Sequence, residues 1–278
     1  MTPETPLDLA AYFERIAYTG PREPTLPVLN ALMAAHVQAI PFENLDVLLG
    51  TGVDIRPEAV FDKLVRRRRG GYCFEQNGLF LRVLTGLGFA VRPASARVRM
   101  SPSTDQAPAG PPPPRTHMFL EVTIGGEPWL ADVGVGALSL TSAIRFTAGD
   151  EQPTPHEPRR IVRQGDRWLH QARLGDDWLD VYEFTGEEMP FIDREVANWY
   201  TSAHPRSHFR NLLMVARATA GGGRITLRDG ELKHRGPDGR SETRVVTSPD
   251  ALLEVLATEF GLVFPPGTRF RPDASAPA

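Results

Sequence analysis

Residues 69–77 read Arg69-Gly70-Gly71-Tyr72-Cys73-Phe74-Glu75-Gln76-Asn77 and contain the only cysteine of the 278-residue chain. A lone cysteine cannot form an intrachain disulfide, and with no other cysteine nearby a structural zinc site is not expected. The two glycines precede a helical pattern, which places Cys73 near a helix N-terminus. Unpaired N–H groups and the positive end of the helix dipole stabilise a thiolate there. A small, buried and inert cysteine is the alternative, but these surroundings favour a reactive thiol.

A thiolate nucleophile usually works with a base that a third group orients, and the best candidates are His117 and Asp132. Residues 115–122 predict a strand, Gly125-Gly126 is a hairpin signal, and residues 128–134 predict a second strand that ends at an acid. If these strands pair about the turn, the two side chains meet at the open end of the hairpin. A carboxylate among apolar residues needs a partner, and we expect it to be the Nδ1–H of His117. Taken singly, such an Asp is more often a turn cap and such a His more often a structural residue.

The spacing of apolar residues changes near residue 90. Before it the spacing is helical, and from Ala90 a period of two predominates, with turn dipeptides between the runs. The sequence therefore predicts a helical N-terminal part followed by an antiparallel barrel or sandwich. Helices are expected over 7–18, 25–39, 59–68, 73–87, 193–201 and 249–260, and strands over 96–100, 118–124, 129–133, 161–164, 167–172 and 178–184, with hairpins over 224–246.

Bulk composition narrows the class of protein. The net charge is −3 and the pI about 6.2, which gives no support to a nucleic-acid partner. No apolar run approaches the ~18 residues of a membrane span, and the polar start Met1-Thr2-Pro3-Glu4 does not predict a signal peptide. One unpaired cysteine is consistent with a reducing cytoplasm, so we expect a cytoplasmic protein without a membrane partner. Arg66 to Arg68 are expected to be the solvated end of a helix, and residues 101–114 a proline-rich surface loop.

The order Cys, His, Asp and the surrounding motifs resemble the arylamine N-acetyltransferase family. The motifs are Arg69 to Asn77, Thr116-His117-Met118 and Asp132-Val133-Gly134. Two further segments agree, Ile40-Pro41-Phe42-Glu43-Asn44-Leu45 and residues 198–209 (Asn-Trp-Tyr-Thr-Ser-Ala-His-Pro-Arg-Ser-His-Phe). The resemblance covers roughly residues 5 to 265, and its cysteine motif is highly specific.

Together with the patterns above, the resemblance implies an α+β fold with a cysteine-protease-like Cys-His-Asp arrangement. We expect a helical bundle over 1–89 that carries Cys73, a central antiparallel β-barrel over 90–192 that carries His117 and Asp132, and a C-terminal α/β lid over 193–278. The site would then lie at the interface of the first two parts, where clefts are common.

The resemblance also implies an activity. It predicts ping-pong acetyl transfer from acetyl-CoA, through acetyl-Cys73, to arylamines, hydrazines or arylhydroxylamines, as in xenobiotic metabolism, with coenzyme A as partner and no metal. The catalytic residues would be Cys73, His117 and Asp132. Phe42, Phe209 and Val135 would contact the acceptor, Thr116 and Gly136 the coenzyme, and Glu43 and Arg69 would form a supporting ion pair.

One loop departs from the family pattern, in which Asp-Val-Gly is usually followed by Phe-Gly-Gly. Here Val135 replaces the aromatic residue and Ala137 a glycine. An amide synthase that closes a macrolactam from a carrier-protein thioester is therefore an alternative within the same chemistry. A cysteine hydrolase and a non-catalytic binding protein with an inert Cys73 are alternatives from other classes.

Overall fold

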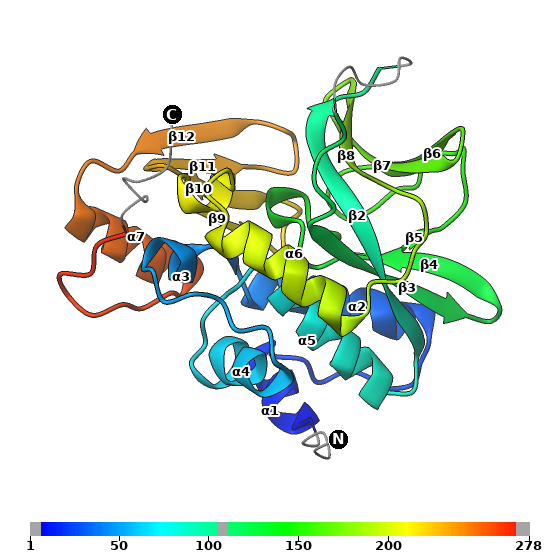
Figure 1. The fold of residues 1–278 in the computed structure, drawn as a ribbon, viewed down its shortest axis with the longest axis horizontal. Helices are drawn as coiled ribbons and strands as arrows, with labels where there is room; N and C mark the ends of the chain where they lie inside the picture. Colours follow the sequence, from blue (N-terminus) through cyan, green and yellow to red (C-terminus); the bar gives the residue numbers. More distant parts are fainter. Residues whose placement is uncertain (1–6, 105–110, 271–278) are drawn as a thin grey trace.

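Two antiparallel sheets and a set of N-terminal helices make up the mixed α/β fold in Figure 1. The computed structural model describes residues 7–104 and 111–270. The larger sheet has seven strands and curves into a nearly closed barrel, and the smaller sheet has five strands. The helix that begins at Cys73 packs against β2 and β3 of the larger sheet, which positions Cys73 beside it.

The N-terminal helices follow the predicted ranges closely. Prolines at the first positions of α2 and α4 suit the fixed φ of a helix start. The single helix expected over 59–68 is instead an α-helix that continues as a π-helix, and the chain turns at Arg68, which has a φ of 53°. The elements are α1 (Leu9–Arg15), α2 (Leu26–Ala39), α3 (Leu45–Leu48), α4 (Pro57–Phe61), the π-helix η1 (Asp62–Arg66) and α5 (Cys73–Gly86).

The seven-stranded sheet has the order β5-β4-β3-β2-β8-β7-β6. Gly125 and Gly126 both have positive φ, as a tight β3–β4 hairpin turn requires, so the hairpin prediction is confirmed. Gln152 lies between the two edge strands: its side-chain amide bonds the backbone of Arg145, and its backbone bonds Arg159. The strands are β2 (Ala90–Pro102), β3 (His117–Ile124), β4 (Glu127–Ala131), β5 (Ile144–Arg145), β6 (Arg159–Gln164), β7 (Arg167–Leu174) and β8 (Asp177–Phe184).

The C-terminal part adds the second sheet, of order β1-β9-β10-β11-β12. Its edge strand β1 (Phe42–Glu43) comes from the N-terminal part of the chain and pairs with β9. The strand patterns above did not predict β1, β5 or β9; β1 and β5 have two residues each, which are too few to establish a period. The other elements are α6 (Phe191–Ala203), the 3₁₀ turns η2 (Gly136–Leu138) and η3 (His208–Arg210), β9 (Met214–Ala218), β10 (Arg224–Arg228), β11 (Glu231–Arg235), β12 (Ser241–Val245) and α7 (Pro249–Phe260).

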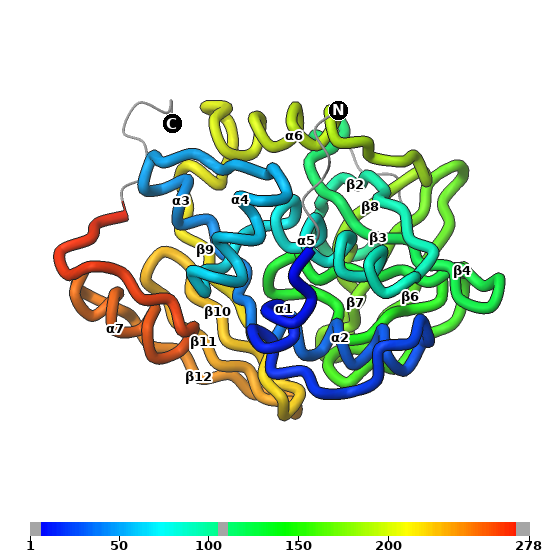
Figure 2. Tube along the Cα trace, turned by 90° about the horizontal axis from the view of Figure 1, so that it is seen from below, coloured from blue at the N-terminus to red at the C-terminus, as the bar shows by residue number. Residues whose placement is uncertain are grey.

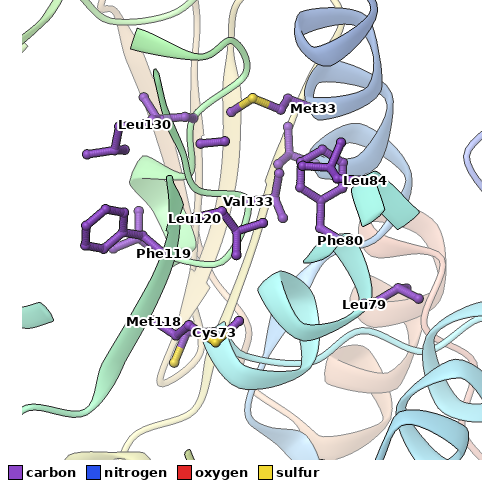
Figure 3. Packing of buried hydrophobic residues seen from close by; sticks show 14 of the residues in the cluster. Met33, Cys73, Leu79, Phe80, Leu84, Met118, Phe119, Leu120, Leu130 and Val133 are labelled. Atoms are coloured by element: carbon purple, nitrogen blue, oxygen red, sulfur yellow. The ribbon is translucent and has the colours of Figure 1, made fainter. Parts of the chain in front are cut away.

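Two hydrophobic clusters hold these elements together. The larger joins the N-terminal helices to the barrel and includes Cys73, Met118 and Val133, which Figure 3 shows where α5 meets the barrel. The smaller joins α3 and α7 to the second sheet. In Figure 2 the second sheet and α7 lie on one side, the barrel strands on the other, and α5 between them. The contacts of α5 are with β2 and β3 of the barrel and with α4.

Within residues 7–104 and 111–270, no helix has the length and apolar character needed to cross a membrane. The central part of the predicted proline-rich loop, residues 105–110, lies outside the described residues.

Candidate active site

Cys73 is the first residue of α5, as the sequence predicted. Glu75, two residues on, turns back and accepts a hydrogen bond from the Tyr72 backbone N–H at 3.0 Å, which fixes the entry of the chain into the helix. Cys73 is only 4% exposed. Its thiol therefore lies at the positive end of a helix and largely out of water.

His117 and Asp132 meet as the hairpin predicted. His117 begins β3 and Asp132 directly follows β4, and a 2.7 Å hydrogen bond joins His117 Nε2 to Asp132 Oδ2. Both side chains are buried. The expected donor atom was wrong: Nε2, not Nδ1, bonds the carboxylate. This leaves Nδ1 for the Cys73 thiol, whose hydrogen bond to the imidazole contributes to the pKa of His117.

Burial alone would lower the pKa of His117. The Asp132 carboxylate beside it has the opposite effect, as does the contact with Cys73, and together they raise the pKa of His117 to about 10. The imidazole is therefore protonated at neutral pH, with a carboxylate on one nitrogen and the sulfur on the other side. This arrangement can hold a thiolate as an ion pair and return a proton to a leaving group.

Asn77 links the helix to the hairpin, and the sequence reasoning assigned it no role. Its Nδ2 donates to Asp132 Oδ1 at 2.8 Å and to the Met118 carbonyl at 2.7 Å, and its Oδ1 accepts from Val133 N at 3.0 Å. Helical spacing could have found it, because Asn77 lies one turn after Cys73 and shares its face of α5.

The loop after Asp132 packs directly against Cys73. A Cβ added to Gly134 would lie 2.9 Å from Cys73 Cα, so only glycine allows this approach. Gly136 lies against the Phe42 ring, and Val135 is buried in the same hydrophobic cluster as Cys73. The Thr116 carbonyl lies 3.6 Å from Cys73 Sγ. Thr116 and Gly134 thus approach Cys73 directly, and Gly136 approaches Phe42.

Aromatic rings line up next to this loop. The centroids of Phe42 and Phe209 are 6.3 Å apart, and those of Phe209 and Tyr72 are 5.6 Å apart. Asn44 holds the Phe209 turn through a 2.7 Å bond to its carbonyl. The candidate acceptor residues Phe42 and Phe209 therefore lie together, and Phe209 contacts Tyr72, the residue that precedes Cys73.

A second aromatic contact lies on the far side of His117. The Tyr182 ring lies 5.0 Å from the imidazole, centroid to centroid, and is fully buried. Sequence reasoning missed this residue, because nothing in the β8 pattern distinguishes it from other core aromatics.

The loop before Cys73 rests on a chain of alternating charges. Arg69 Nη2 lies 2.8 Å from both Glu43 Oε1 and Asp46 Oδ1, and Lys63 Nζ lies 2.7 Å from Asp46 Oδ2 and 2.6 Å from Glu75 Oε1. The predicted contact of Arg69 with Glu43 is thus present. Burial raises the pKa of Glu75 to about 7, although Lys63 opposes the shift. Asp46 and Lys63 were missed, since only the fold brings them to this site.

Backbone pairing supports the same loop. The Glu43 N–H donates to the Gly71 carbonyl at 3.1 Å, and Phe42 forms a parallel bridge with Gly71. In contrast to Arg69, Arg66 to Arg68 are exposed, as predicted. Among the residues that the structure describes, no cluster of three or more His, Cys, Asp or Glu side chains could hold a metal ion.

Comparison with known proteins gives a consistent result. A family model described as N-acetyltransferase matches residues 25–267. The arylamine N-acetyltransferase of Mycobacterium tuberculosis H37Rv is 45% identical over 92% of this chain and 89% of the relative. The solved structure of arylamine N-acetyltransferase from M. tuberculosis superposes with a TM-score of 0.86 at 45% identity, over 91% of this chain and 93% of that one.

A solved structure from Mycobacterium marinum, an arylamine N-acetyltransferase in complex with CoA, is also similar. Its TM-score is 0.85 at 41% identity, over 91% of this chain and 92% of that one. These relatives give no support to the amide synthase, hydrolase or binding-protein alternatives. The chain belongs to the arylamine N-acetyltransferase family and is an acyltransferase of the N-acetyltransferase class.

Proposed function

We propose that this enzyme transfers an acetyl group from acetyl-CoA to small arylamines, hydrazines or arylhydroxylamines through an acetyl-Cys73 intermediate. The observation that carries the proposal is the buried hydrogen-bonded series of Cys73, His117 and Asp132 at the N-terminus of α5. Cys73 is the nucleophile, His117 the acid and base, and Asp132 the group that orients the imidazole.

In the first half-reaction the Cys73 thiolate attacks the thioester carbonyl and forms a carbon–sulfur bond. The oxyanion that develops accepts a hydrogen bond from the backbone N–H of Cys73, because the first N–H group of a helix has no partner within it. The carbon–sulfur bond to coenzyme A then breaks. The His117 imidazolium gives its proton to the departing thiolate, which leaves as coenzyme A, and acetyl-Cys73 remains beside a neutral imidazole.

In the second half-reaction the amine attacks acetyl-Cys73 and forms the new amide bond. His117, now neutral, accepts the proton that the amine loses. Collapse of the intermediate breaks the bond to Cys73 and regenerates the thiolate–imidazolium pair. Asp132 keeps Nε2–H of the imidazole in place, so that Nδ1 faces the sulfur in both steps.

The residues around Cys73 support this choice of substrates. The relative in complex with CoA supports coenzyme A as the donor's carrier, and we assign Thr116 and Gly136 to its pantetheine end. The rings of Phe42 and Phe209, with Val135, form an apolar surface for an aromatic acceptor. Such a surface also keeps water from the thioester, which would otherwise be hydrolysed. A cytoplasmic location, where the thiol stays reduced, follows as part of the proposal.

Steady-state kinetics with acetyl-CoA and a simple aniline test this function. We expect parallel double-reciprocal lines as the two concentrations are varied, because free enzyme and acetyl-enzyme alternate. Intersecting lines would contradict the covalent intermediate. Absence of any acetylated aniline would contradict the substrate class and favour a different acceptor.

A further inference from the structure

A buried cluster of one carboxylate and two guanidinium groups lies behind the loop that follows Asp132. Glu157 Oε2 bonds Arg159 Nη2 at 2.9 Å, and both oxygens of Glu157 accept from Arg224, at 2.7 Å each. A third arginine, Arg235, contacts Glu157 from the rim. The side chains of Glu157, Arg159 and Arg224 are 6%, 1% and 3% exposed. We call these three residues the Glu157 clamp.

The clamp reaches the loop through two consecutive backbone carbonyls. Arg159 Nη2 donates to the Leu138 carbonyl at 2.9 Å, and Arg224 Nη2 donates to the Ser139 carbonyl at 2.9 Å. The loop is closed at its base by a 2.7 Å bond from Leu140 N to the Asp132 carbonyl. The clamp therefore fixes one end of a closed loop whose other end carries Asp132.

The three residues come from separate parts of the fold. Glu157 precedes β6, Arg159 is in β6 of the barrel, and Arg224 is in β10 of the second sheet. The clamp thus sets the loop relative to both sheets at once. The Glu157 carboxylate accepts hydrogen bonds from both guanidinium groups and so fixes their orientation. In that orientation each arginine also directs one N–H group to a carbonyl of the loop.

The clamp also touches the packing behind the catalytic imidazole. Arg159 Nη1 lies 3.4 Å from His170 Nε2, the His170 ring lies 4.7 Å from Tyr182, and Tyr182 lies 5.0 Å from His117. Burial and the positive charge of Arg159 hold the pKa of His170 well below its usual range. His170 is therefore neutral, and its Nε2 can accept from Arg159.

We propose that Glu157, with Arg159 and Arg224, is a positioning group for acetyl transfer, which holds the loop over residues 133–139 against Cys73 and so aligns Asp132 and the substrates. The clamp acts through the loop, and none of its members touches the reacting atoms. The proposal rests on Cys73 as the nucleophile.

The test compares Glu157→Gln with Glu151→Gln. Glu151, six residues before Glu157, is a matched control. It also forms an ion pair with an arginine, at 2.8 Å from Arg173, but its side chain is 39% exposed. For each variant we measure the single-turnover rate of Cys73 acetylation by acetyl-CoA, kcat and KM, and amide exchange in peptides covering 133–140. All are measured well below the melting temperature of each variant.

We expect Glu157→Gln to slow acetylation at saturating acetyl-CoA by about tenfold or more, because small misplacements of catalytic groups have large effects. Exchange in 133–140 should accelerate, while peptides of α5 keep their wild-type rate. Glu151→Gln should match the wild type in both. Unchanged acetylation and exchange in folded Glu157→Gln would overturn the proposal.

Arg224→Lys keeps the test decisive if Glu157→Gln does not fold. Lysine retains the charge beside Glu157, but its single ammonium cannot reproduce the fork that also reaches the Ser139 carbonyl. We expect a folded variant with slower acetylation and faster loop exchange. An acetylation rate that falls only in proportion to the fraction of folded Arg224→Lys protein would overturn the positioning role. Failure of the wild type itself to form acetyl-Cys73 would instead contradict the proposed function.

Discussion

Arg69→Ala should weaken both the fold and the chemistry, because it removes the cation that joins two acids beneath the Cys73 loop. The Arg69 side chain is 13% exposed and that of Glu43 is 0% exposed, and Arg69 is 2.8 Å from both Glu43 and Asp46. Its backbone directly precedes Gly70-Gly71, which leads to Tyr72 and Cys73. Loss of the side chain removes this cation from Glu43, which keeps the hydrogen bond from the Leu45 N–H.

The magnitude can be worked from these contacts. Removing one partner of a buried ion pair costs about 3–5 kcal/mol. We use the lower value, about 3 kcal/mol, because Lys63 still neutralises Asp46 after Arg69 is lost. The Arg69 guanidinium also lies 4.4 Å from the centre of the Phe264 ring, a contact worth about 0.5–1 kcal/mol. At about 3 °C per kcal/mol, the melting temperature should fall by roughly 10 °C.

Thermal unfolding and the rate of Cys73 acetylation measure the two effects, with Arg66→Ala as the matched control. Arg66 is exposed and its guanidinium lies over the Phe61 ring, so its removal should cost no more than about 0.5–1 kcal/mol, the value of that contact. Adding Glu43→Gln to Arg69→Ala should recover part of the loss, because it removes the unpaired buried charge. Equal and small effects at Arg66 and Arg69 would refute the reasoning.

Asp132→Asn should abolish most turnover and also lower stability, since the neutral amide leaves the buried imidazolium without its counter-charge. Near-normal kcat would show that Asp132 does not orient His117. Cys73→Ser should remove acetyl transfer while circular dichroism stays unchanged, and more than a small residual turnover would exclude Cys73 as the nucleophile. Gly134→Ala should impair folding and activity because the added Cβ would lie 2.9 Å from Cys73 Cα. Gly78 is in α5, and a Cβ added there meets nothing within 4 Å, so Gly78→Ala should stabilise the protein by about 0.5–1 kcal/mol. Equal melting temperatures for the two variants would contradict the packing described. The protonated His117 contributes its full stability below about pH 6.5, and this contribution is lost as the pH rises toward its folded pKa of about 10. The difference in unfolding free energy between the wild type and His117→Gln should therefore shrink over that pH range. A difference that stays constant to pH 10 would mean that the imidazole is not held protonated.

The sequence was sufficient for the elements that depend on local pattern. The glycines before Cys73, the Gly125-Gly126 turn and Pro249 at the start of α7 each signal a boundary through backbone chemistry, and each boundary is where it was expected. The meeting of His117 and Asp132 also followed from local pairing, because the hairpin register is set by its turn.

Other parts of the site could not be predicted because they depend on contacts between distant segments. Asp46 meets Lys63 only after the turn that precedes α4 has formed, and Glu157 meets Arg224 across 67 residues. The strand β1 exists only because β9 pairs with it. The nitrogen of His117 that bonds Asp132 depends on a ring rotation that no sequence pattern specifies. The division into parts at residues 89 and 192 remains a prediction.

The central claim is that Cys73 carries the acetyl group between donor and acceptor. Intact-mass spectrometry after mixing the enzyme with acetyl-CoA, without an amine, tests it most directly. We predict a mass increase of one acetyl group, located on Cys73 by peptide mapping and lost when an arylamine is added with release of the acetylated amine. An enzyme that acetylates arylamines while its own mass never changes, or that carries the acetyl group on another residue, would contradict the account.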